Sequence, residues 1–268
     1  MSERYFHVNR YTPGAGSSDP TEERQTNMTE HLKLLISHGD KGGTGKSMAA
    51  ALALDHLLAT GAPVLLIEGD AGIPDLALRF DGSVPVELVN LNRAGDSETS
   101  FNKLGNILET AADAGQHVVI NMPAGAGDTI DELAPVLADV VSAVGYELVV
   151  TFSIGPHSTS TDALVKSLQR GLLSVVDPAR RSVLFPLFLG IAEQFNWSKS
   201  PKRADFISAG GKESSIPALR PDDLRDKVLA TPGAFSLLAE DKTALTITER
   251  ALFRRWLALA HAAIASVV

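Results

Sequence analysis

The chain has 268 residues, of which 44% are hydrophobic and 21% are charged, and its formal net charge is −8 at pH 7. This length and composition favour one large globular domain and exclude a chain that is disordered throughout. The sequence contains no cysteine, so disulfides, iron–sulfur clusters and thiolate metal sites are excluded on chemical grounds. The negative charge argues against a general nucleic-acid coat protein.

The N-terminal segment differs in composition from the rest of the chain. Residues 1–30 are polar, contain Pro13, Gly14, Gly16 and Pro20, and show no apolar periodicity. We therefore expect a flexible tail over residues 1–30 and a single domain over residues 31–268. The N-terminus lacks the apolar segment of a secretory signal, and no run of about 18 apolar residues follows it, which predicts a cytoplasmic location.

From Leu32 onward, short apolar runs alternate with stretches of helical periodicity. This alternation is typical of an α/β fold with a mostly parallel central sheet, here of about seven strands, and helices on both faces. Strands are expected at residues 32–37, 64–68, 86–91, 118–121, 148–153, 183–189 and 215–219. Helices are expected at residues 46–60, 98–114, 129–143, 160–175, 202–208 and 222–229. A capping box, Thr246-x-x-Glu249, predicts a last helix that ends near Val267.

The most specific motif lies between the first predicted strand and the first predicted helix, and reads Gly39-Asp40-Lys41-Gly42-Gly43-Thr44-Gly45-Lys46-Ser47. Its glycines allow successive backbone N–H groups to face phosphate oxygens, Lys46 supplies a positive charge to the β- and γ-phosphates, and Ser47 offers a hydroxyl to Mg²⁺. A purely structural glycine turn does not explain the lysine, the serine and the following helix together. The predicted nucleotide-binding residues of this loop are Lys41, Gly42, Gly43, Thr44, Gly45, Lys46, Ser47 and Met48.

The loop departs from the ordinary phosphate-binding loop at two positions. Asp40 stands where that loop has glycine, and an additional lysine, Lys41, follows it. The string KGGTGKS resembles the deviant Walker A motif of the ParA/MinD-like P-loop ATPases, the SIMIBI class. The resemblance implies a P-loop NTPase fold in which ATP bridges two protomers, with Lys46 acting on its own nucleotide and Lys41 reaching the nucleotide of the partner subunit. The alternative for Lys41 is a solvated loop lysine.

Two acidic residues, Glu68 and Asp70, follow the second predicted strand at the edge of the sheet where such folds bind ligands. The family has a similar strand that ends in Asp-x-Asp. The resemblance therefore assigns Asp70 the orientation of the attacking water and makes Glu68 a metal-site residue. A carboxylate can accept a hydrogen bond from water and align it for attack on the γ-phosphate. The alternative is an acidic residue that only caps the following loop.

The fourth predicted strand continues into Asn121-Met122-Pro123-Ala124-Gly125 and resembles the Walker B strand of the family. Asn121 occupies the position at which the relatives have an aspartate. Its amide oxygen can accept a hydrogen bond from a metal-bound water but carries no charge. We therefore predict a Mg²⁺ site with Ser47, Glu68 and Asn121, and slow ATP hydrolysis.

Two later segments extend the resemblance, which covers roughly residues 32–229. Residues 155–163 look like the proline-containing loop and helix start of the family. The segment around Ile216 is similar to the one on which the relatives pack the adenine, which makes Pro217 and Arg220 candidate cofactor-binding residues. The chain has no Asn/Thr-Lys-x-Asp motif for reading guanine, so ATP is favoured over GTP.

The missing cysteines also narrow the choice among the relatives. The iron–sulfur and arsenite-handling branches of the superfamily need thiols, which this chain lacks. What remains is a Mg²⁺-dependent ATPase that acts as a dimerisation switch in plasmid partition, cargo positioning or conjugation. Two alternatives stay open: an ATP-dependent small-molecule enzyme similar to dethiobiotin synthetase, whose relatives usually lack the additional lysine, and a nucleotide-binding module with little turnover.

The expected partners are a second copy of the chain when ATP is bound and an unidentified partner or cargo protein. Candidates for contact with non-specific DNA are Arg180, Arg181, Lys199, Lys202 and Arg203, although interspersed acidic residues favour a solvated surface. The last helix combines a wide apolar arc with only three cations, Arg250, Arg254 and Arg255. This composition favours packing on the domain over attachment to a membrane.

Overall fold

The computed structural model describes residues 31–39, 41–70, 72, 74–91 and 97–267. The predicted tail over residues 1–30 and the unusual Asp40 lie outside these described residues. Among the described helices, none is both long and apolar enough to cross a membrane.

A seven-stranded parallel sheet with the order β3-β2-β4-β1-β5-β6-β7 forms the centre of the described part of the chain. The strands are β1 (Lys33–His38), β2 (Val64–Glu68), β3 (Val86–Leu88), β4 (His117–Asn121), β5 (Glu147–Ser153), β6 (Arg181–Pro186) and β7 (Lys212–Ile216). The central strands read as nearly continuous apolar runs because helices cover both of their faces. The predicted α/β class is confirmed.

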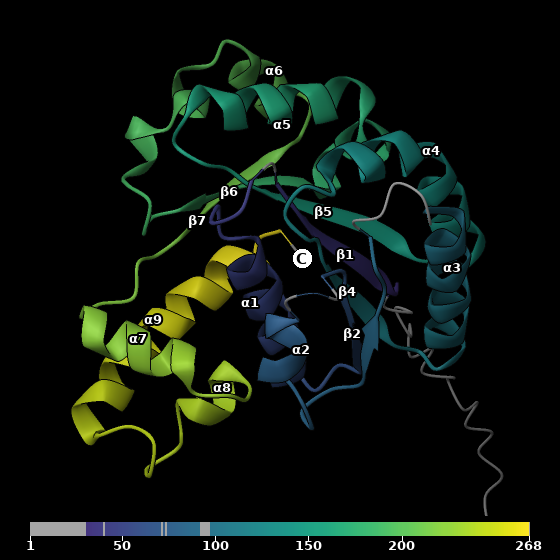
Figure 1. Ribbon diagram of the computed structural model, residues 1–268. Helices are drawn as coiled ribbons and strands as arrows, with labels where there is room; N and C mark the ends of the chain where they lie inside the picture. Colours follow the sequence, from purple (N-terminus) through teal and green to yellow (C-terminus); the bar gives the residue numbers. More distant parts are fainter. Residues whose placement is uncertain (1–30, 40, 71, 73, 92–96, 268) are drawn as a thin grey trace, which may run out of the picture. The chain divides into compact units, whose positions relative to one another are not determined.

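The described helices divide between the two faces of the sheet (Figure 1). They are α1 (Lys46–Ala59), α2 (Asp75–Arg79), α3 (Ser97–Asp113), α4 (Gly127–Ala143), α5 (Ser158–Arg170), α6 (Lys202–Ser208), α7 (Asp222–Ala230), α8 (Phe235–Leu238) and α9 (Ile247–Ala265). Side chains alternate along each strand, so Leu34 and Ile36 of β1 enter the apolar cluster under α3, α4 and α5. Leu35 enters the opposite cluster, which α1, α7, α8 and α9 complete.

The phosphate-loop helix α1 lies between the sheet and the C-terminal helix α9. Its alanines, such as Ala50 and Ala53, are fully buried, and their small side chains allow this close packing. Asp55 of α1 is also fully buried and accepts hydrogen bonds from the Ser236 backbone N–H at 2.9 Å and from the Ser236 hydroxyl at 3.1 Å. His261 Nε2 of α9 lies 2.9 Å from the same carboxylate. One buried acid thus joins three helices.

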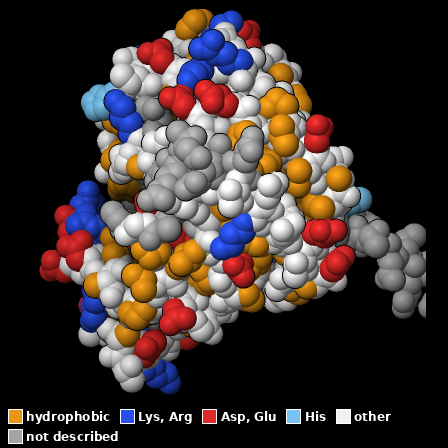
Figure 2. Space-filling view, turned by 45° about the vertical axis from the view of Figure 1, so that its right-hand side comes forward, with side chains coloured by type: hydrophobic (Ala, Val, Ile, Leu, Met, Phe, Trp, Pro, Cys, Tyr) orange, Lys and Arg blue, Asp and Glu red, His pale blue; other side chains and the backbone are white. Residues whose placement is uncertain are grey.

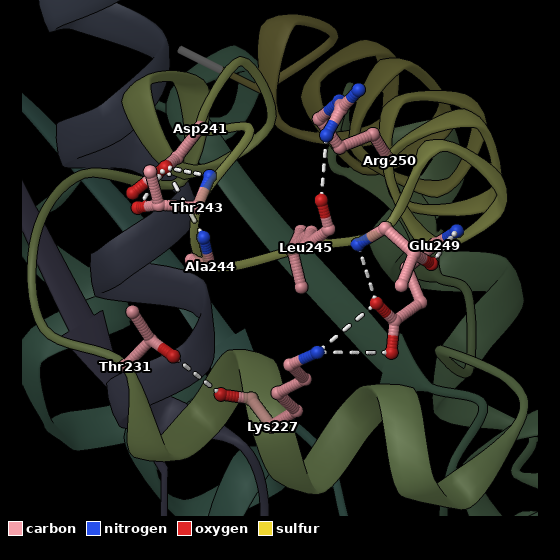
Figure 3. Close-up of polar contacts among 9 residues, drawn as sticks. Lys227, Thr231, Asp241, Thr243, Ala244, Leu245, Glu249 and Arg250 are labelled. Atoms are coloured by element: carbon pink, nitrogen blue, oxygen red, sulfur yellow. Dashed lines mark hydrogen bonds and ion pairs between the residues drawn. The ribbon is translucent and has the colours of Figure 1, made fainter.

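The start of α9 is fixed by the predicted capping box and by α7. The Glu249 backbone N–H donates to the Thr246 hydroxyl, and the Thr246 N–H donates to the Glu249 carboxylate at 2.7 Å, which confirms the predicted helix start. Lys227 reaches the same carboxylate from α7 with an Nζ–O distance of 3.0 Å (Figure 3). These contacts hold α7 against α9.

Several element boundaries differ from the prediction. Strand β7 spans Lys212–Ile216 rather than 215–219. It is a polar edge strand, so it lacks the apolar run on which the strand prediction was based. Strand β6 ends at Pro186 and β3 at Leu88, both three residues early. The helix predicted at 160–175 is α5 followed, after Gly171, by a short 3₁₀ turn. The short helices α2 and α8 were not predicted.

Candidate functional site

The phosphate loop connects β1 to α1 through a backbone that requires glycine. Gly43 and Gly45 have φ angles of 78° and 92°, in the left-handed region. At Gly39, an added Cβ would lie 2.9 Å from the carbonyl oxygen of Ser153, so the loop runs directly against the end of β5. Gly45 is also the N-cap of α1 and has no side chain to bond the first-turn N–H groups. The N-terminus of α1, with the positive end of its helix dipole, therefore suits an anion.

The loop forms one wall of a cavity of about 470 Å³ at the carboxyl edge of the sheet. The predicted residues that line this cavity are Gly42, Gly43, Gly45, Lys46, Ser47, Met48, Asp70 and Asn121. The structure therefore brings together phosphate-loop, water-orienting and Walker B positions that are far apart in the sequence. Their roles in binding and catalysis stay predictions.

Lys46 is buried, with 6% of its surface exposed, and its Nζ donates a hydrogen bond to the carbonyl of Lys41 at 2.7 Å. The Ser37 hydroxyl donates to the carbonyl of Lys46 at 2.8 Å, which fixes the first turn of α1 to β1. The Thr44 hydroxyl also donates to the Lys41 carbonyl, so Thr44 supports the loop and does not line the cavity.

Lys41 lies apart from the cavity formed by its own loop. Its side chain is exposed, and Nζ lies 3.4 Å from the hydroxyl of Thr159 at the start of α5. The charge of Lys41 is therefore presented on the surface beside the cavity.

Glu68 and Asn121 face each other across paired strands. They are register partners in β2 and β4, and their residues are 0% and 2% exposed. Asn121 Nδ2 donates to Glu68 Oε1 at 3.0 Å, and the Asp70 backbone N–H donates to the same oxygen at 3.2 Å. Gly69 permits this close approach, because a Cβ there would lie 2.7 Å from the carbonyl oxygen of Asn121. A buried carboxylate of β2 thus lies against the side-chain amide at the end of β4.

Two oxygens of this pair have no hydrogen-bond partner among the described residues: Glu68 Oε2 and Asn121 Oδ1 are both buried and unsatisfied. Burial raises the pKa of the Glu68 carboxyl from 4.5 to about 7, and the hydrogen bonds from Asp70 and Asn121 oppose that shift. Both oxygens can only accept when Glu68 is ionised, so they suit the waters of a hydrated Mg²⁺.

The described residues contain no group of three His, Asp or Glu side chains that could hold a metal ion alone. This is compatible with Mg²⁺, which is usually bound through one or two side chains, several waters and the phosphates of the nucleotide. Ser47 lines the cavity and would offer its hydroxyl to such an ion.

Asp70 lines the cavity, and its Oδ1 accepts a hydrogen bond from the Gly72 backbone N–H at 3.1 Å. This bond belongs to a loop-capping arrangement and also leaves the carboxylate at the cavity wall. Geometry is therefore compatible both with the water-orienting role and with the structural alternative.

A second, apolar cavity of about 300 Å³ shares the walls Met48 and Phe188 with the first. Pro217 lines this second cavity, as its predicted nucleotide role requires. Arg220 lines neither cavity, is exposed, and forms an ion pair with Asp222. The structure therefore gives no support to Arg220 as a nucleotide-binding residue.

Sequence reasoning did not identify several residues that complete the two cavities. These are Asp75, Met122, Pro123, Ala124 and Phe188 in the first cavity, with Phe235 and Trp256 in the second. Met122, Pro123 and Ala124 could have been predicted as cavity residues, because they directly follow Asn121 in the same strand-and-loop segment. Phe188 could not have been predicted from the sequence, because only tertiary packing brings the loop after β6 to Gly45.

Comparison with known proteins finds a sequence relative and similar solved structures. No protein-family model matches it. Protein MobD of Acidithiobacillus ferrooxidans is 26% identical over 219 residues, which cover 81% of this chain and 90% of MobD. The similar solved structures include the septum site-determining protein MinD of Pyrococcus horikoshii with Mg-ADP, with a TM-score of 0.47, 17% identity and coverage of 84% of this chain and 95% of MinD.

A second similar structure is the MinC:MinD cell division protein complex of Aquifex aeolicus. Its matched chain has a TM-score of 0.47 and 16% identity, with coverage of 85% of this chain and 96% of the other. The chain is thus similar in sequence to MobD, and the solved structures similar to it include MinD proteins.

Proposed function

We propose that the protein is an ATP-dependent switch that binds ATP with Mg²⁺, hydrolyses it slowly and joins two copies of the chain while the triphosphate is bound. Its role would be the partition, positioning or transfer of a cargo through a partner protein. The observation that carries the proposal is the single cavity in which the phosphate loop, Asp70 and Asn121 meet.

Binding follows from charge and from oriented donors. The first-turn N–H groups of α1 and the ammonium of the buried Lys46 would bind the β- and γ-phosphates. A bound Mg²⁺ would neutralise charge that develops on the phosphates, held by Ser47 directly and by Glu68 and Asn121 through its waters. Asp70 would accept a hydrogen bond from the attacking water and align it with the γ-phosphate.

Dimerisation would depend on Lys41. Its side chain is exposed and does not line the cavity of its own subunit. This placement favours the trans role that the deviant Walker A resemblance implies. MinD of Aquifex aeolicus forms a complex with MinC, and by analogy we propose that the ATP-bound form of this protein also recognises a partner.

DNA is a weaker proposal as a partner, because three of the five predicted basic residues, Arg180, Lys202 and Arg203, pair with acidic side chains. Arg180 pairs with Glu147 and Arg203 pairs with Glu213, each with an N–O distance of 2.6 Å. On the face drawn in Figure 2, basic and acidic side chains are interspersed and do not form a continuous basic patch.

The rate of ATP hydrolysis distinguishes the switch from the second candidate function. That candidate is a nucleotide-binding module with little turnover, and the uncharged Asn121 favours it. We expect Asp70→Ala to lower the single-turnover rate of phosphate release by about 100-fold or more without abolishing ATP binding, because the attacking water loses its acceptor. Asn121→Asp should raise the Mg²⁺-dependent rate, because a second carboxylate holds the hydrated metal more firmly.

The measurement is phosphate release in single turnover, beside nucleotide affinity by isothermal titration, for wild type and both variants. A wild-type rate that Asp70→Ala leaves unchanged would contradict the role of Asp70. Release in none of the three proteins, with ATP bound in each, would replace the switch by the binding module. A small-molecule kinase, the enzyme alternative, would show one nucleotide-independent mass in solution.

A further inference from the structure

A third cavity, of about 190 Å³, lies between helices α5 and α6 (Figure 1). It shares no lining residue with the phosphate cavity or with the apolar cavity beside it. Its apolar walls are Val165, Leu168, Pro178, Phe206 and Ala209. This cavity is therefore separate from the proposed nucleotide site.

Phe206 gives the cavity an aromatic wall. It is the buried residue of α6, with 6% of its surface exposed, whereas the other residues of this helix are exposed. Its ring meets Trp197 edge-on, with 5.8 Å between the ring centroids. A Cβ added to Gly211 would lie 2.4 Å from the Phe206 Cζ, so only glycine leaves room for the ring. The aromatic wall is thus held in place by the fold itself.

Arg181, the first residue of β6, supplies a positive charge to the cavity wall. Its Nε donates to the carbonyl of Val176 at 2.7 Å, and neither Nη group has a hydrogen bond or ion pair within the described part of the chain. Burial lowers the pKa of its guanidinium, and attraction to Asp177 opposes that shift only in part. The neighbouring Arg180 differs, because it pairs with Glu147. The Arg181 guanidinium can therefore bind an anion from outside the chain.

The second cation of the cavity wall already has an acidic neighbour. Lys202 Nζ lies 3.2 Å from a carboxylate oxygen of Asp205, and both residues line the cavity. A ligand with several negative charges would meet the Asp205 carboxylate. DNA is a poor match for this arrangement, because phosphate backbones are bound by several cations in a row. The cavity walls instead complement one negative charge next to hydrocarbon.

The size of the cavity limits how much of a ligand it can enclose. Cavities that bind whole small molecules usually measure about 300 to 1,000 Å³, and this one measures about 190 Å³. It has room for one amino-acid residue. The C-terminal residue of a protein carries an apolar side chain and a carboxylate on the same Cα atom, and C-terminal carboxylates are recognised in this way by other binding sites.

We propose that this cavity binds the C-terminal residue of a partner protein, with an apolar side chain such as that of leucine against Phe206 and the terminal carboxylate on Arg181. Two Nη groups of one guanidinium can form two parallel hydrogen bonds with a carboxylate, which adds geometric specificity to the charge attraction. The inference goes beyond the proposed switch, because no nucleotide contact takes part in it.

The first test titrates the full chain, without nucleotide, with the peptide acetyl-Gly-Gly-Leu and follows the backbone amide signals by NMR. Signals of α5 and α6 should shift. The C-terminal amide of this peptide should bind about 10-fold more weakly or less, because it lacks the charge. Acetyl-Gly-Gly-Gly should bind similarly weakly, because it buries no apolar side chain.

Three outcomes of this titration would overturn the inference. They are equal affinities for the acid and the amide, no binding of the acid, and shifts confined to other elements. Displacement of the peptide by a short DNA duplex would assign the cavity to phosphates and would overturn it as well. The titration needs no variant and no bound nucleotide, so its result is independent of whether the proposed switch is correct.

The second test isolates Arg181. Arg181→Met should weaken acetyl-Gly-Gly-Leu by about 10-fold or more, and Arg181→Lys should retain part of the affinity, because it keeps the charge but not the paired donors. Lys199→Met is the matched control, because Lys199 is an exposed member of the same predicted basic set and does not line the cavity. With circular dichroism confirming the fold, equal affinities of Arg181→Met and Lys199→Met would overturn the role of Arg181.

Discussion

Glu68 is a fully buried acid whose ionisation is costly in the folded protein. Burial raises its pKa from 4.5 to about 7. Between these two values the folded state holds a proton that the unfolded state has released, so the free energy of unfolding falls as pH rises through this window. The residue that would help to hold the metal therefore lowers the stability of the metal-free protein at neutral pH.

We expect Glu68→Gln to remove this pH dependence, because the amide stays neutral and its oxygen can still accept from Asp70 N–H. Urea unfolding of both proteins without Mg²⁺ or nucleotide, at pH 5 and pH 8, gives the comparison. The stability of wild type relative to the variant should drop by about 2 to 3 kcal/mol between those pH values. If the stability difference between the two proteins does not change with pH, the pKa of Glu68 is not raised in the folded protein.

Part of the site could be predicted at the level of single residues and part could not. The phosphate loop is a continuous string between a strand and a helix, so the sequence alone singled out six residues that line the cavity: Gly42, Gly43, Gly45, Lys46, Ser47 and Met48. Arg220 was proposed because the segment around Ile216 resembles the adenine-packing segment of the family, whereas in the structure its side chain pairs with Asp222. The orientation of a surface side chain depends on neighbours that a sequence does not place.

At the scale of elements, those with a strong local sequence pattern were predicted correctly, whereas those that depend on tertiary neighbours were missed or misplaced. Strand β2 and helix α6 have the predicted boundaries, because a buried strand and a helix between turn residues leave strong local patterns. Strand β7 pairs only with β6 and contributes polar residues such as Lys212 and Ser214. This strand forms because its backbone pairs with β6, and the apolar periodicity of the sequence does not predict such pairing.

The packing of α9 on α1 includes a polar contact between the buried Asp55 and His261. We expect His261→Ala to lower the free energy of unfolding by about 2 kcal/mol, the usual loss for a hydrogen bond to a buried charged group. Leu259→Ala is the control, because Leu259 lies on the same helix and is 57% exposed, so its removal should change stability by no more than about 0.5 kcal/mol. Chemical denaturation measures both. Equal effects of the two substitutions would mean that the Asp55–His261 contact contributes nothing specific.

At the scale of the whole molecule, the proposal concerns the association of two chains. Lys46, to which we assign a role within its own subunit, is buried, whereas Lys41 is exposed beside the cavity. Under the proposal, Lys46 would neutralise phosphates in its own subunit and Lys41 would reach the nucleotide of a second copy.

Analytical sedimentation with ADP, ATP and a non-hydrolysable ATP analogue tests this separation most directly, on wild type, Lys46→Ala and Lys41→Ala. Wild type should be a dimer only with a triphosphate. Lys46→Ala should lose nucleotide binding, whereas Lys41→Ala should bind ATP nearly as wild type does and stay monomeric, because its charge is needed only by the partner's nucleotide. A wild-type mass that is the same in all three nucleotides, or a Lys41→Ala protein that still dimerises with ATP, would contradict the account.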